Sequence, residues 1–378
     1  MKKIVVLGAG MVGREVARDL SRSFAVTSVD ASQAALDVAA KLAPIATQRA
    51  DLSTPEAIKQ AVRDADLVVG ALPGFLGRMA LQAVIESGKN AVDIAFFPED
   101  CFELDALAKS KGVTAIVDFG VAPGMSNVFM GYHNKRMQSV ERFECLVGGL
   151  PRAREFPFEY KAVFSPADVL EEYTRPARYI EHGQLVVRPA LTDPDLIDFE
   201  HIGTLEAFNT DGLRTLAQTM TAPNMKEKTL RYPGHARLMQ AFRDSGFFSK
   251  EPIEIRGVKI SPLEFTSRVM FPSWQLKKGQ EEFTVMRVTI EGVNEAGRRE
   301  RIDYDLYDKY DPVHDVTSMA RTTGYSCTAA VQLLATGMFD RKGVCPPEFV
   351  AEDQKCFDFL LDHQRERNIH YKKTVTPL

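Results

Sequence analysis

The sequence predicts an α/β fold: a doubly wound parallel sheet of the Rossmann type, joined to an inserted α+β domain with a mostly antiparallel sheet. Three observations predict this fold class. The first third of the chain alternates apolar runs with helical patterns, as strands and helices around a parallel sheet do. A glycine triplet, Gly8-x-Gly10-x-x-Gly13, follows the first apolar run. Later segments alternate polar with apolar residues, which is typical of antiparallel strands with one wet face.

The first predicted βαβ unit spans residues 3–30 and carries the clearest signal. Residues 4–7 form a short apolar run and predict a buried strand, which the glycines connect to a helical pattern. Gly8 permits a tight turn, Gly10 lets the backbone approach a pyrophosphate, and Gly13 lets the helix pack close to the strand. The helix N-terminus presents free N–H groups and its positive dipole end. This order of elements predicts a dinucleotide site.

Asp30 ends the second apolar run, at the distance expected for an acid that accepts hydrogen bonds from the adenosine ribose hydroxyls. Its charge would repel a 2′-phosphate. The residues that follow, Ala31-Ser32-Gln33, include no arginine to neutralise such a phosphate. The sequence therefore predicts NAD rather than NADP as the cofactor.

Further strands and helices alternate through the rest of the first third. The expected helices are residues 32–42, 54–62, 80–87 and 104–110, and the expected strands are residues 46–50, 66–72, 90–94 and 114–117. Ligands of such sheets lie across the carboxyl ends of the strands. The expected cofactor contacts are Gly8, Gly10, Met11, Val12, Gly13, Asp30, Asp51, Leu52, Ala71, Leu72, Pro73, Asp93 and Gly120. Asp51 could instead be a helix cap or turn residue, and Asp93 could bind a loop at its strand end.

The pattern changes after residue 124. Isolated strands are expected over residues 142–148 and near 259–260, and a hairpin over residues 282–291 and 301–307 with a turn between them. A helix rich in small residues, 320–339, is expected to pack on the first domain, and the charged end of the chain is expected to be solvated. The expected organisation is a dinucleotide-binding domain (1–122), a substrate-binding and dimerisation domain (123–312), a return to the first domain (313–350) and a C-terminal tail (351–378).

Composition argues against several classes of protein. The net charge of −4 leaves no basic excess for a nucleic-acid backbone. Five scattered cysteines without a CxxC pair indicate reduced thiols rather than disulfides or zinc. The seven histidines never approach a ligand spacing, so no metal is expected. No apolar stretch could cross a bilayer, and a strand within three residues of the start leaves no room for a signal peptide. We expect a cytoplasmic protein without membrane or nucleic-acid partners.

Several segments resemble the saccharopine dehydrogenase (reductase) family. They are residues 118–127 (DFGVAPGMSN), 147–151 (VGGLP), 164–166 (FSP), 230–235 (LRYPGH) and 320–325 (ARTTGY). Within this family, residues 171–178 (EEYTRPAR) and 211–214 (DGLR) are most similar to the lysine 6-dehydrogenase branch. The resemblance covers nearly the whole chain, and its motifs are more specific to the family than to one substrate.

The resemblance implies a Rossmann domain closed by the late helix and an intervening domain that forms the substrate pocket and assembles a homodimer or higher homo-oligomer. It also implies NAD-linked oxidation of a small amino acid, lysine, at its ε-carbon to a semialdehyde that cyclises. A sister hypothesis is a reductase that joins or splits a secondary amine, as in saccharopine or carboxynorspermidine metabolism. It would need extra cationic groups for a second carboxylate. A third hypothesis is a non-catalytic NAD-binding sensor or assembly module.

Amine oxidation requires a neutral amine, and the unperturbed pKa of the lysine ε-amine is about 10.4, so a base or a desolvating pocket is needed. The candidate bases are His235 and Asp93. His235 follows a Pro-Gly turn and has an ordinary pKa near neutrality, although it could equally be a loop histidine bonded to the backbone.

The candidate ligands of the substrate α-carboxylate are arginines. Arg214 and Arg231 offer the forked N–H geometry that a carboxylate prefers. Lys161 could add a point charge, and Tyr160 could pack against the aliphatic part of the substrate. The ordinary alternatives are a surface ion pair for either arginine and core packing for Tyr160.

Overall fold

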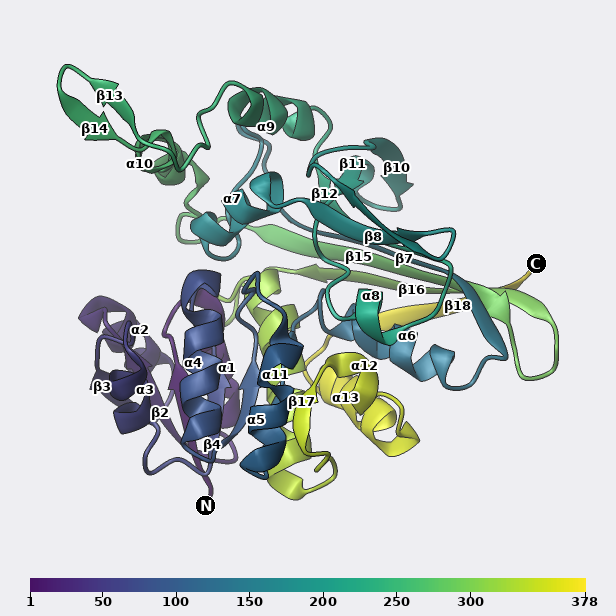
Figure 1. The fold of residues 1–378 in the computed structure, drawn as a ribbon, viewed down its shortest axis with the longest axis horizontal. Helices are drawn as coiled ribbons and strands as arrows, with labels where there is room; N and C mark the ends of the chain where they lie inside the picture. The colour runs from purple at the N-terminus through teal and green to yellow at the C-terminus, as the bar shows by residue number, and fades with distance from the viewer. The chain divides into compact units, whose positions relative to one another are not determined.

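The protein folds into two compact units in a computed structural model that describes residues 1–378 (Figure 1). The first unit contains residues 1–136 and 319–370, and the second contains residues 137–318 and 371–378. The chain therefore passes from one unit to the other three times.

The first unit is built on a parallel sheet of seven strands. The strands are β1 (Lys3–Leu7), β2 (Ala25–Asp30), β3 (Ala46–Arg49), β4 (Leu67–Gly70), β5 (Asn90–Asp93), β6 (Thr114–Ile116) and β17 (Gly343–Cys345). Their order is β17-β6-β5-β4-β1-β2-β3, and all six pairings are parallel. The order reverses direction at β1, as in a doubly wound fold, and this confirms the predicted Rossmann-type sheet.

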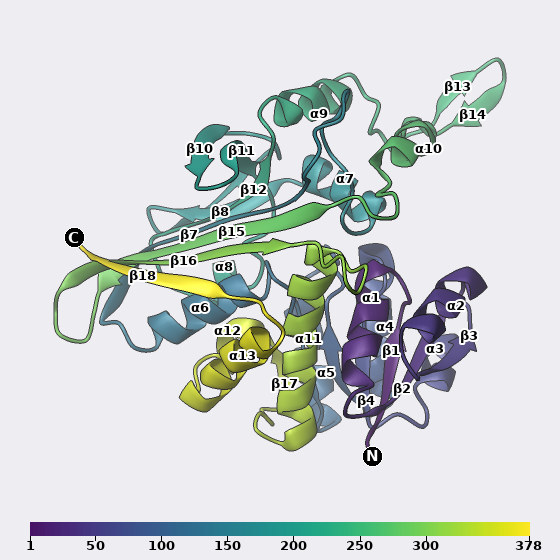
Figure 2. The ribbon, with the colours of Figure 1, turned by 180° about the vertical axis from the view of Figure 1, so that it is seen from behind.

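Helices cover this sheet (Figure 2). They are α1 (Met11–Leu20), α2 (Gln33–Leu42), α3 (Pro55–Ala61), α4 (Gly74–Glu86), the 3₁₀ helix η1 (Cys101–Leu104), α5 (Asp105–Ser110), α6 (Met125–Asn134), α11 (Ser318–Thr336), α12 (Pro347–Val350) and α13 (Gln354–Glu366). Ser32 and Thr54 cap the N-termini of α2 and α3 through their side chains. Helix α4 begins at Gly74 rather than at residue 80, because Pro73 stands in an extended conformation immediately before its first turn.

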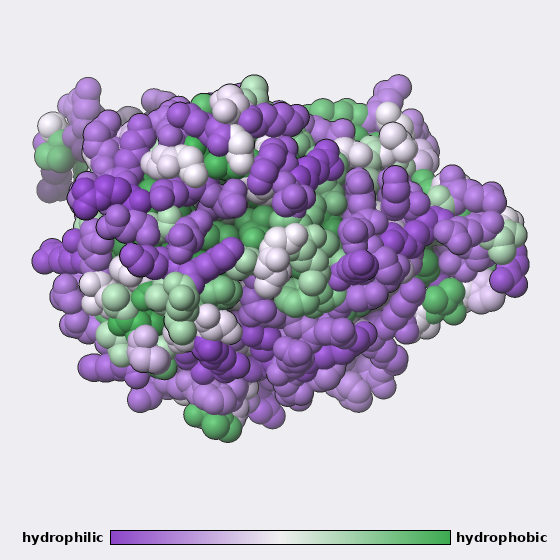
Figure 3. Space-filling model, turned by 90° about the horizontal axis from the view of Figure 1, so that it is seen from below, coloured by the Kyte–Doolittle hydropathy of each residue, from purple (hydrophilic) through white to green (hydrophobic).

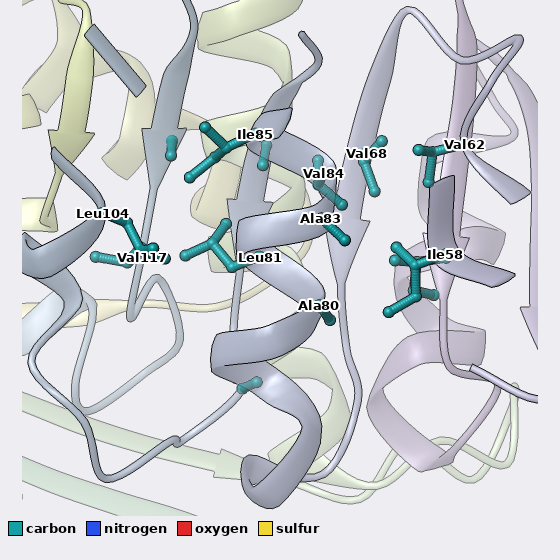
Figure 4. Packing of buried hydrophobic residues seen from close by; sticks show 14 of the residues in the cluster. Ile58, Val62, Val68, Ala80, Leu81, Ala83, Val84, Ile85, Leu104 and Val117 are labelled. Carbon is teal, nitrogen blue, oxygen red and sulfur yellow. The ribbon is translucent and has the colours of Figure 1, made fainter. Parts of the chain in front are cut away.

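Helix α4 supplies much of the core of the first unit. Figure 4 shows Leu81 and Ile85 directed toward Leu104 and Val117, and Val84 directed toward Val68. All six of these side chains are buried. Continuous apolar strands between helices leave both faces of the sheet dry, which fits their lack of polar alternation.

The late helix α11 packs against α1 within the first unit (Figure 2). Tyr325 of α11 donates a hydrogen bond to Glu15 of α1 (2.5 Å), and Arg18 bonds to the same hydroxyl (3.1 Å). One turn further, Thr328 bonds to Asp19 (2.7 Å). The interface between α1 and α11, which are far apart in the sequence, therefore contains hydrogen bonds in addition to the small residues of α11.

The second unit contains a mixed sheet of nine strands. They are β7 (Ser139–Pro151), β8 (Ala177–Glu181), β9 (Gln184–Arg188), β10 (Asp195–Phe199), β11 (Gly203–Asn209), β12 (Asn224–Arg231), β15 (Glu282–Val293), β16 (Arg299–Lys309) and β18 (Tyr371–Pro377). The path is β10-β11-β12-β7-β15-β16-β18, with β8 beside β12 and β9 beside β8. Only β7 and β12 are parallel neighbours, so the mostly antiparallel sheet and the hairpin β15–β16 are confirmed. The wet face expected for this hairpin is wrong for β15, which has no exposed residue.

Four helices and a separate hairpin complete the second unit. They are α7 (Pro166–Thr174), α8 (Leu216–Thr219), α9 (His235–Asp244), α10 (Pro262–Trp274), and the strands β13 (Ile253–Ile255) and β14 (Val258–Ile260), which pair only with each other. Aromatic rings from α7, α9 and α10 form one core cluster, with Trp274 at its centre.

The expected C-terminal tail (351–378) is folded, although most charged side chains of residues 364–373 are exposed, as expected. Helix α13 buries Phe357 and Leu360 in the first unit, and β18 then pairs with β16 over seven residues from Tyr371 to Pro377. Strand β18 was not predicted because its lysines are typical of a solvated segment, although an exposed edge strand also commonly carries lysine. Helix α6 also differs from the expected boundary at residue 122, because it belongs to the first unit.

The surface seen in Figure 3 is mainly hydrophilic, with scattered apolar patches. None of the helices is both long and apolar enough to span a bilayer. All five cysteines are free and buried. No group of three or more histidine, cysteine or acidic side chains is arranged to hold a metal ion.

Candidate functional site

The glycine loop has the packing that its sequence predicts. Gly8 adopts φ 106°, and a Cβ there would lie 2.4 Å from the carbonyl oxygen of Ala71. A Cβ at Gly13 would lie 2.2 Å from the carbonyl oxygen of Gly8, so the start of α1 sits against the end of β1. Gly10 faces open space, with nothing within 4 Å of the corresponding position. Met11 and Val12 follow as the first residues of α1, where N–H groups are free for an anion.

Asp30 ends β2 beside this loop. Its Oδ2 accepts a hydrogen bond from the Ala9 amide (2.7 Å), and its Oδ1 accepts one from the Ser32 amide (2.7 Å). These two bonds fix the carboxylate at the carboxyl edge of the sheet, next to the loop that would hold a diphosphate. Sequence reasoning missed Arg49, which is paired with Asp30 across β2 and β3 and donates to the Ala31 carbonyl (3.1 Å). Only the pairing of these strands could have revealed it.

Gly70 ends β4 and Asp93 ends the adjacent strand β5, and the two residues are paired in the register of these strands. Asp93 is buried, and its Oδ1 accepts a hydrogen bond from the Ala95 amide (2.9 Å). A Cβ at Gly70 would lie only 1.9 Å from Asp93 Oδ2. The strand-end hydrogen bond that we considered for Asp93 therefore exists, and the absent side chain at Gly70 makes room for its second oxygen.

The remaining predicted cofactor residues differ in their surroundings. Asp51 is exposed and accepts a bond from the Ser53 amide (3.0 Å), which is the turn role considered for it, and Leu52 is part of the apolar core. Ala71 continues the ladder to Leu7, and Leu72 and Pro73 lead into α4. Gly120 donates to the Pro123 carbonyl (3.0 Å).

Asp118 also lies at this edge of the sheet. It follows β6, is buried and has φ 54°, a left-handed conformation that aspartate tolerates better than most residues. Its place at a strand end and in the segment DFGVAPGMSN was visible in the sequence, although its backbone conformation was not.

A buried polar network occupies one face of β12 in the second unit. Arg231 is buried, and each of its three guanidinium nitrogens donates a hydrogen bond inside the protein. It donates to Glu172 Oε2 (2.8 Å), to the Tyr173 hydroxyl (3.2 Å) and to the Leu230 carbonyl (2.9 Å). Burial alone would lower the pKa of Arg231, but the neighbouring tyrosines and Glu172 raise it overall. This saturated guanidinium suits a structural cation better than a fork for a substrate carboxylate.

His235 belongs to the same network and is poorly suited to act as a base. Its Nδ1 lies 2.9 Å from the Phe158 carbonyl oxygen, which can only accept, so Nδ1 carries the proton. Its Nε2 then accepts from the Tyr173 hydroxyl (2.9 Å). Burial, followed by the positive charge of Arg231, lowers the pKa of His235 to about 3. The geometry favours the backbone-bonded histidine among our two interpretations.

Tyr160 and Lys161 lie beside this network. The Tyr160 ring is 5.2 Å from the His235 ring, and the Arg231 guanidinium lies 4.6 Å from the Tyr160 centroid. Lys161 Nζ binds the Ser273 carbonyl (2.8 Å) and a carboxylate oxygen of Glu155 (2.9 Å). Three of the four predicted substrate residues, with His235, therefore gather around one aromatic cluster, and core packing is evident for Tyr160.

Arg214 lies in a second group of charges. Asp211 accepts two parallel bonds from Arg178, both 2.8 Å long, and this pair ties the loop before α8 to the segment after α7. Arg214 follows Asp211 in this loop with φ 51°. Burial, and then the nearby positive charge of Arg214, lower the pKa of Arg175. The guanidinium groups of Arg175 and Arg214 are therefore close to each other. Arg175 was missed because nothing in its local sequence shows that it is partly buried.

Glu227 is the third residue that sequence reasoning missed. It is buried on β12 and accepts a hydrogen bond from the Thr210 hydroxyl (2.8 Å), which also contacts Thr229 (2.8 Å). A Cβ at Gly212 would lie 2.1 Å from Glu227 Oε2. Burial raises the pKa of Glu227 to about 8. Perturbed ionisable groups gathered in this way are typical of functional sites.

Two family models match the chain. The saccharopine dehydrogenase NADP binding domain matches residues 4–116, and the saccharopine dehydrogenase C-terminal domain matches residues 120–369. The chain is similar to "Saccharopine dehydrogenase [NADP(+), L-glutamate-forming]" of Schizosaccharomyces pombe, with 20% identity over 99% of each chain. It is also similar to carboxynorspermidine synthase of Vibrio cholerae, with 22% identity over 75% of this chain and 74% of that protein.

Solved structures share the fold. Apo saccharopine dehydrogenase (L-Glu forming) from Saccharomyces cerevisiae superposes with a TM-score of 0.78 at 18% identity and covers all of both chains. The homospermidine synthase of Legionella pneumophila, solved in complex with NAD, gives a TM-score of 0.68 at 12% identity over 99% of this chain and 91% of that one. Because the two family models together span nearly the whole sequence, the chain belongs to the saccharopine dehydrogenase family of oxidoreductases.

Proposed function

We propose that this protein oxidises the ε-carbon of free lysine in the cytoplasm and uses NAD as its cofactor. The observation that carries the proposal is the group of charges in the second unit, in which Arg175 lies near both Arg214 and the buried Asp211. A free amino acid carries a carboxylate and an ammonium group, so its site needs cations and anions together. The five free, buried cysteines suit the reducing cytoplasm.

The reaction removes two hydrogens from the C–N bond. NAD, when bound, accepts the hydride from the ε-carbon. The ε-amine must first lose a proton, and the resulting imine takes up water to release ammonia and the semialdehyde. The free α-amine then attacks the aldehyde to close a piperideine carboxylate ring. The protein must therefore remove a proton, hold the carboxylate and orient the ε-carbon.

We assign the proton transfer to Asp93. Burial and two occupied nitrogens leave His235 unable to take a proton near neutral pH. Asp93 ends β5 at the carboxyl edge of the Rossmann sheet, where ligands of this fold bind, and the absent side chain at Gly70 makes room for its Oδ2. General-base catalysis by a positioned carboxylate contributes about 10²- to 10⁴-fold.

We assign the α-carboxylate to Arg214, supported by Arg175. Arg231 is the weaker of the two arginines that we considered, because its donors are bound to Glu172, Tyr173 and a backbone carbonyl. Arg214 is partly exposed and lies on a loop that the Asp211–Arg178 pair holds in place. A charge-assisted fork of this kind is geometrically selective for a carboxylate.

NAD is favoured over NADP by the fixed carboxylate of Asp30. Repulsion of a 2′-phosphate and the lost hydrogen bonds of the ribose should together disfavour NADP by about 2–4 kcal/mol. Arg49 favours NADP instead, because its positively charged guanidinium lies beside Ala31 and would attract a 2′-phosphate. The names of two relatives include NADP(+), which makes the preference worth measuring directly.

A second candidate is a saccharopine-type or carboxynorspermidine-type dehydrogenase. Relatives with these names match most of the chain. Arg175 beside Arg214 also supplies the additional cation that a second carboxylate would need. This candidate keeps the hydride chemistry and the cofactor site but requires a secondary amine as its substrate.

A substrate panel tests these proposals. The purified protein is incubated with NAD or NADP and with lysine, saccharopine, a carboxylated polyamine or a diamine, and NAD(P)H absorbance is followed. Turnover of lysine supports the leading proposal, and turnover only of the N-substituted amino acids supports the second. Turnover of a diamine that lacks a carboxylate contradicts the assigned role of Arg214. Tight NAD binding without turnover of any substrate would support the sensor hypothesis instead.

A further inference from the structure

Residues 210–214, which we call the Arg214 loop, follow β11 and lead to α8 in the second unit (Figure 1). Arg214 adopts φ 51°, a left-handed conformation that arginine seldom adopts. Such a conformation persists only where the surrounding structure holds the backbone, and it occurs mostly at active sites and ligand sites. The contacts that hold this loop therefore determine which directions the guanidinium of Arg214 can take.

Glu227 of β12 makes two of these contacts. Its carboxyl group accepts a hydrogen bond from the Thr210 hydroxyl (2.8 Å) and another from the Gly212 amide. We call these two bonds the clamp. Because the Thr210 proton is directed to Glu227, the Thr229 hydroxyl donates to Thr210 (2.8 Å). A Cβ at Gly212 would lie 2.1 Å from Glu227 Oε2, so the loop approaches the carboxyl group more closely than a residue with a side chain would allow.

Two further contacts secure the same loop. Arg178 of β8 donates two parallel bonds to Asp211, and the Leu213 side chain is buried. The clamp holds the residues on either side of Asp211. With these anchors the backbone has little freedom at Arg214, which follows Gly212 by two residues.

Glu227 is uncharged near pH 7. Burial raises its pKa to about 8, and the negative charges of Glu172 in α7 and of Asp211 add to this effect, whereas the clamp bonds oppose it. Glu172 is bound to Arg231, and Asp211 is bound to Arg178. Each of these acids therefore has a cation of its own, while Glu227 keeps its proton.

A neutral carboxyl group suits this position. An ionised Glu227 would attract the guanidinium of Arg214 and compete for it with a substrate carboxylate. The neutral group accepts the two clamp bonds and leaves the charges of Arg214 and its neighbour Arg175 to the substrate.

We propose that Glu227 is a positioning residue of the substrate site, and that through the clamp it fixes the loop that presents Arg214 to the α-carboxylate. This inference rests on the role proposed above for Arg214, and it gives Glu227 no contact with the substrate. Loss of the clamp should therefore weaken substrate binding and leave the chemical step unchanged. A contact that is equally strong in the ground state and the transition state affects KM rather than kcat.

The test compares two replacements of Glu227 in the full-length protein. Glu227→Gln keeps a carbonyl oxygen that can accept both clamp bonds, whereas Glu227→Met keeps the length of the side chain and removes the acceptor. With the best substrate of the panel at pH 7, Glu227→Met should raise KM at least about tenfold and keep kcat within about twofold, and Glu227→Gln should keep the natural KM. Lys226→Met, on the opposite face of the same strand, is the matched control and should also keep it.

A double-mutant cycle shows whether Glu227 acts through Arg214. In the Arg214→Ala background, Glu227→Met should raise KM by less than about twofold more, because the loop then presents no guanidinium. Equal factors in the two backgrounds overturn the proposal, as does an unchanged KM in Glu227→Met or a Gln variant that is no better than the Met variant. If Arg214→Ala itself leaves KM unchanged, the proposed carboxylate site is wrong and this inference fails with it.

The pH dependence of KM gives a second readout. Above pH 8 Glu227 ionises, so KM of the natural protein should rise more steeply with pH than KM of Glu227→Gln, which cannot ionise. Parallel pH profiles for the two proteins would contradict a neutral clamp.

Amide hydrogen exchange tests the clamp without any substrate. Peptides that cover residues 210–216 should exchange at least about tenfold faster in Glu227→Met than in the natural protein or in Glu227→Gln. NAD affinity, measured by calorimetry, should be the same in all of these variants. Unchanged exchange in Glu227→Met overturns the clamp even if Arg214 binds the substrate, so failure of this inference is distinguishable from failure of the proposed function.

Discussion

Asp93 and Gly70 are neighbours on adjacent parallel strands, and the carboxylate of Asp93 fills the space that a side chain at Gly70 would need. The glycine therefore sets the position of an acid that is far from it in the sequence. If Asp93 removes the proton from the amine, the smallest enlargement of Gly70 must disturb the reaction.

We expect Gly70→Ala to lower kcat by about 10²-fold, because a new methyl group 1.9 Å from Asp93 Oδ2 must displace the carboxylate. Steady-state kinetics on the best substrate of the panel measure this effect. Gly324→Ala is the matched control, since a Cβ there meets its nearest neighbour, Val16, at an ordinary 3.5 Å. The control should keep its activity and its melting temperature. An active Gly70→Ala enzyme would argue against Asp93 as the base.

Asp30→Ala should narrow the difference between the kcat/KM values measured with NAD and with NADP. The carboxylate is expected to account for about 2–4 kcal/mol of discrimination, or about 30- to 1000-fold in the ratio of kcat/KM values. Removing the neighbouring cation by Arg49→Ala should widen the difference. Asp37→Ala, on the exposed side of α2, is the control. Equal kinetics with both cofactors in the natural protein would contradict the predicted preference.

Arg214→Ala should lower kcat/KM by about 30- to 1000-fold with little change in NAD affinity. Arg214→Lys keeps the charge but loses the fork, so it should recover only part of the loss. Unchanged turnover in Arg214→Ala would place the carboxylate elsewhere, with Arg175 and Lys161 the next candidates.

Arg231→Ala should act on stability instead. It leaves Glu172 without its cation, which costs about 3–5 kcal/mol for a buried pair; we expect the lower end, because 19% of the Glu172 side chain is exposed. Denaturant unfolding measures this loss. A stable but inactive Arg231→Ala protein would instead indicate that Arg231 binds the substrate.

Glu227 should make the protein less stable as pH rises. Its pKa is about 8 in the folded protein and about 4.5 when unfolded, so between these values the folded state binds the proton and the unfolded state does not. The free energy of unfolding should therefore decrease with pH across this window, by up to about 1.4 kcal/mol per pH unit from this group. Glu227→Gln imitates the protonated form and should remove that part of the slope, whereas the exposed control Glu295→Gln should not. Parallel slopes for Glu227→Gln and the natural protein would show that Glu227 is ionised in the fold.

The fold was largely predictable because its signals are local. The apolar run before Gly8, the alternation through β15 and the turn into β16 each depend on residues that are close in the sequence. Strand β18 was missed because its side chains are exposed and polar, so no apolar pattern marks it.

The candidate site was less predictable because its properties depend on distant neighbours. The donors of Arg231 and the nitrogens of His235 are occupied by residues of other elements, such as Tyr173. Arg49 reaches the vicinity of Asp30 only through strand pairing, and the raised pKa of Glu227 results from burial that its own segment does not indicate.

The three passages between the two units affect how this protein can be made. Strand β17 of the first sheet is synthesised after all of residues 137–318, and β18 completes the second sheet only with residues 371–377. Many multidomain chains complete one domain on the ribosome before the next emerges. Here neither sheet gains its last edge strand until residues 343–345 and 371–377 have been made, so both sheets are completed late in the order of synthesis. For the same reason, expression of either unit alone requires two segments to be joined.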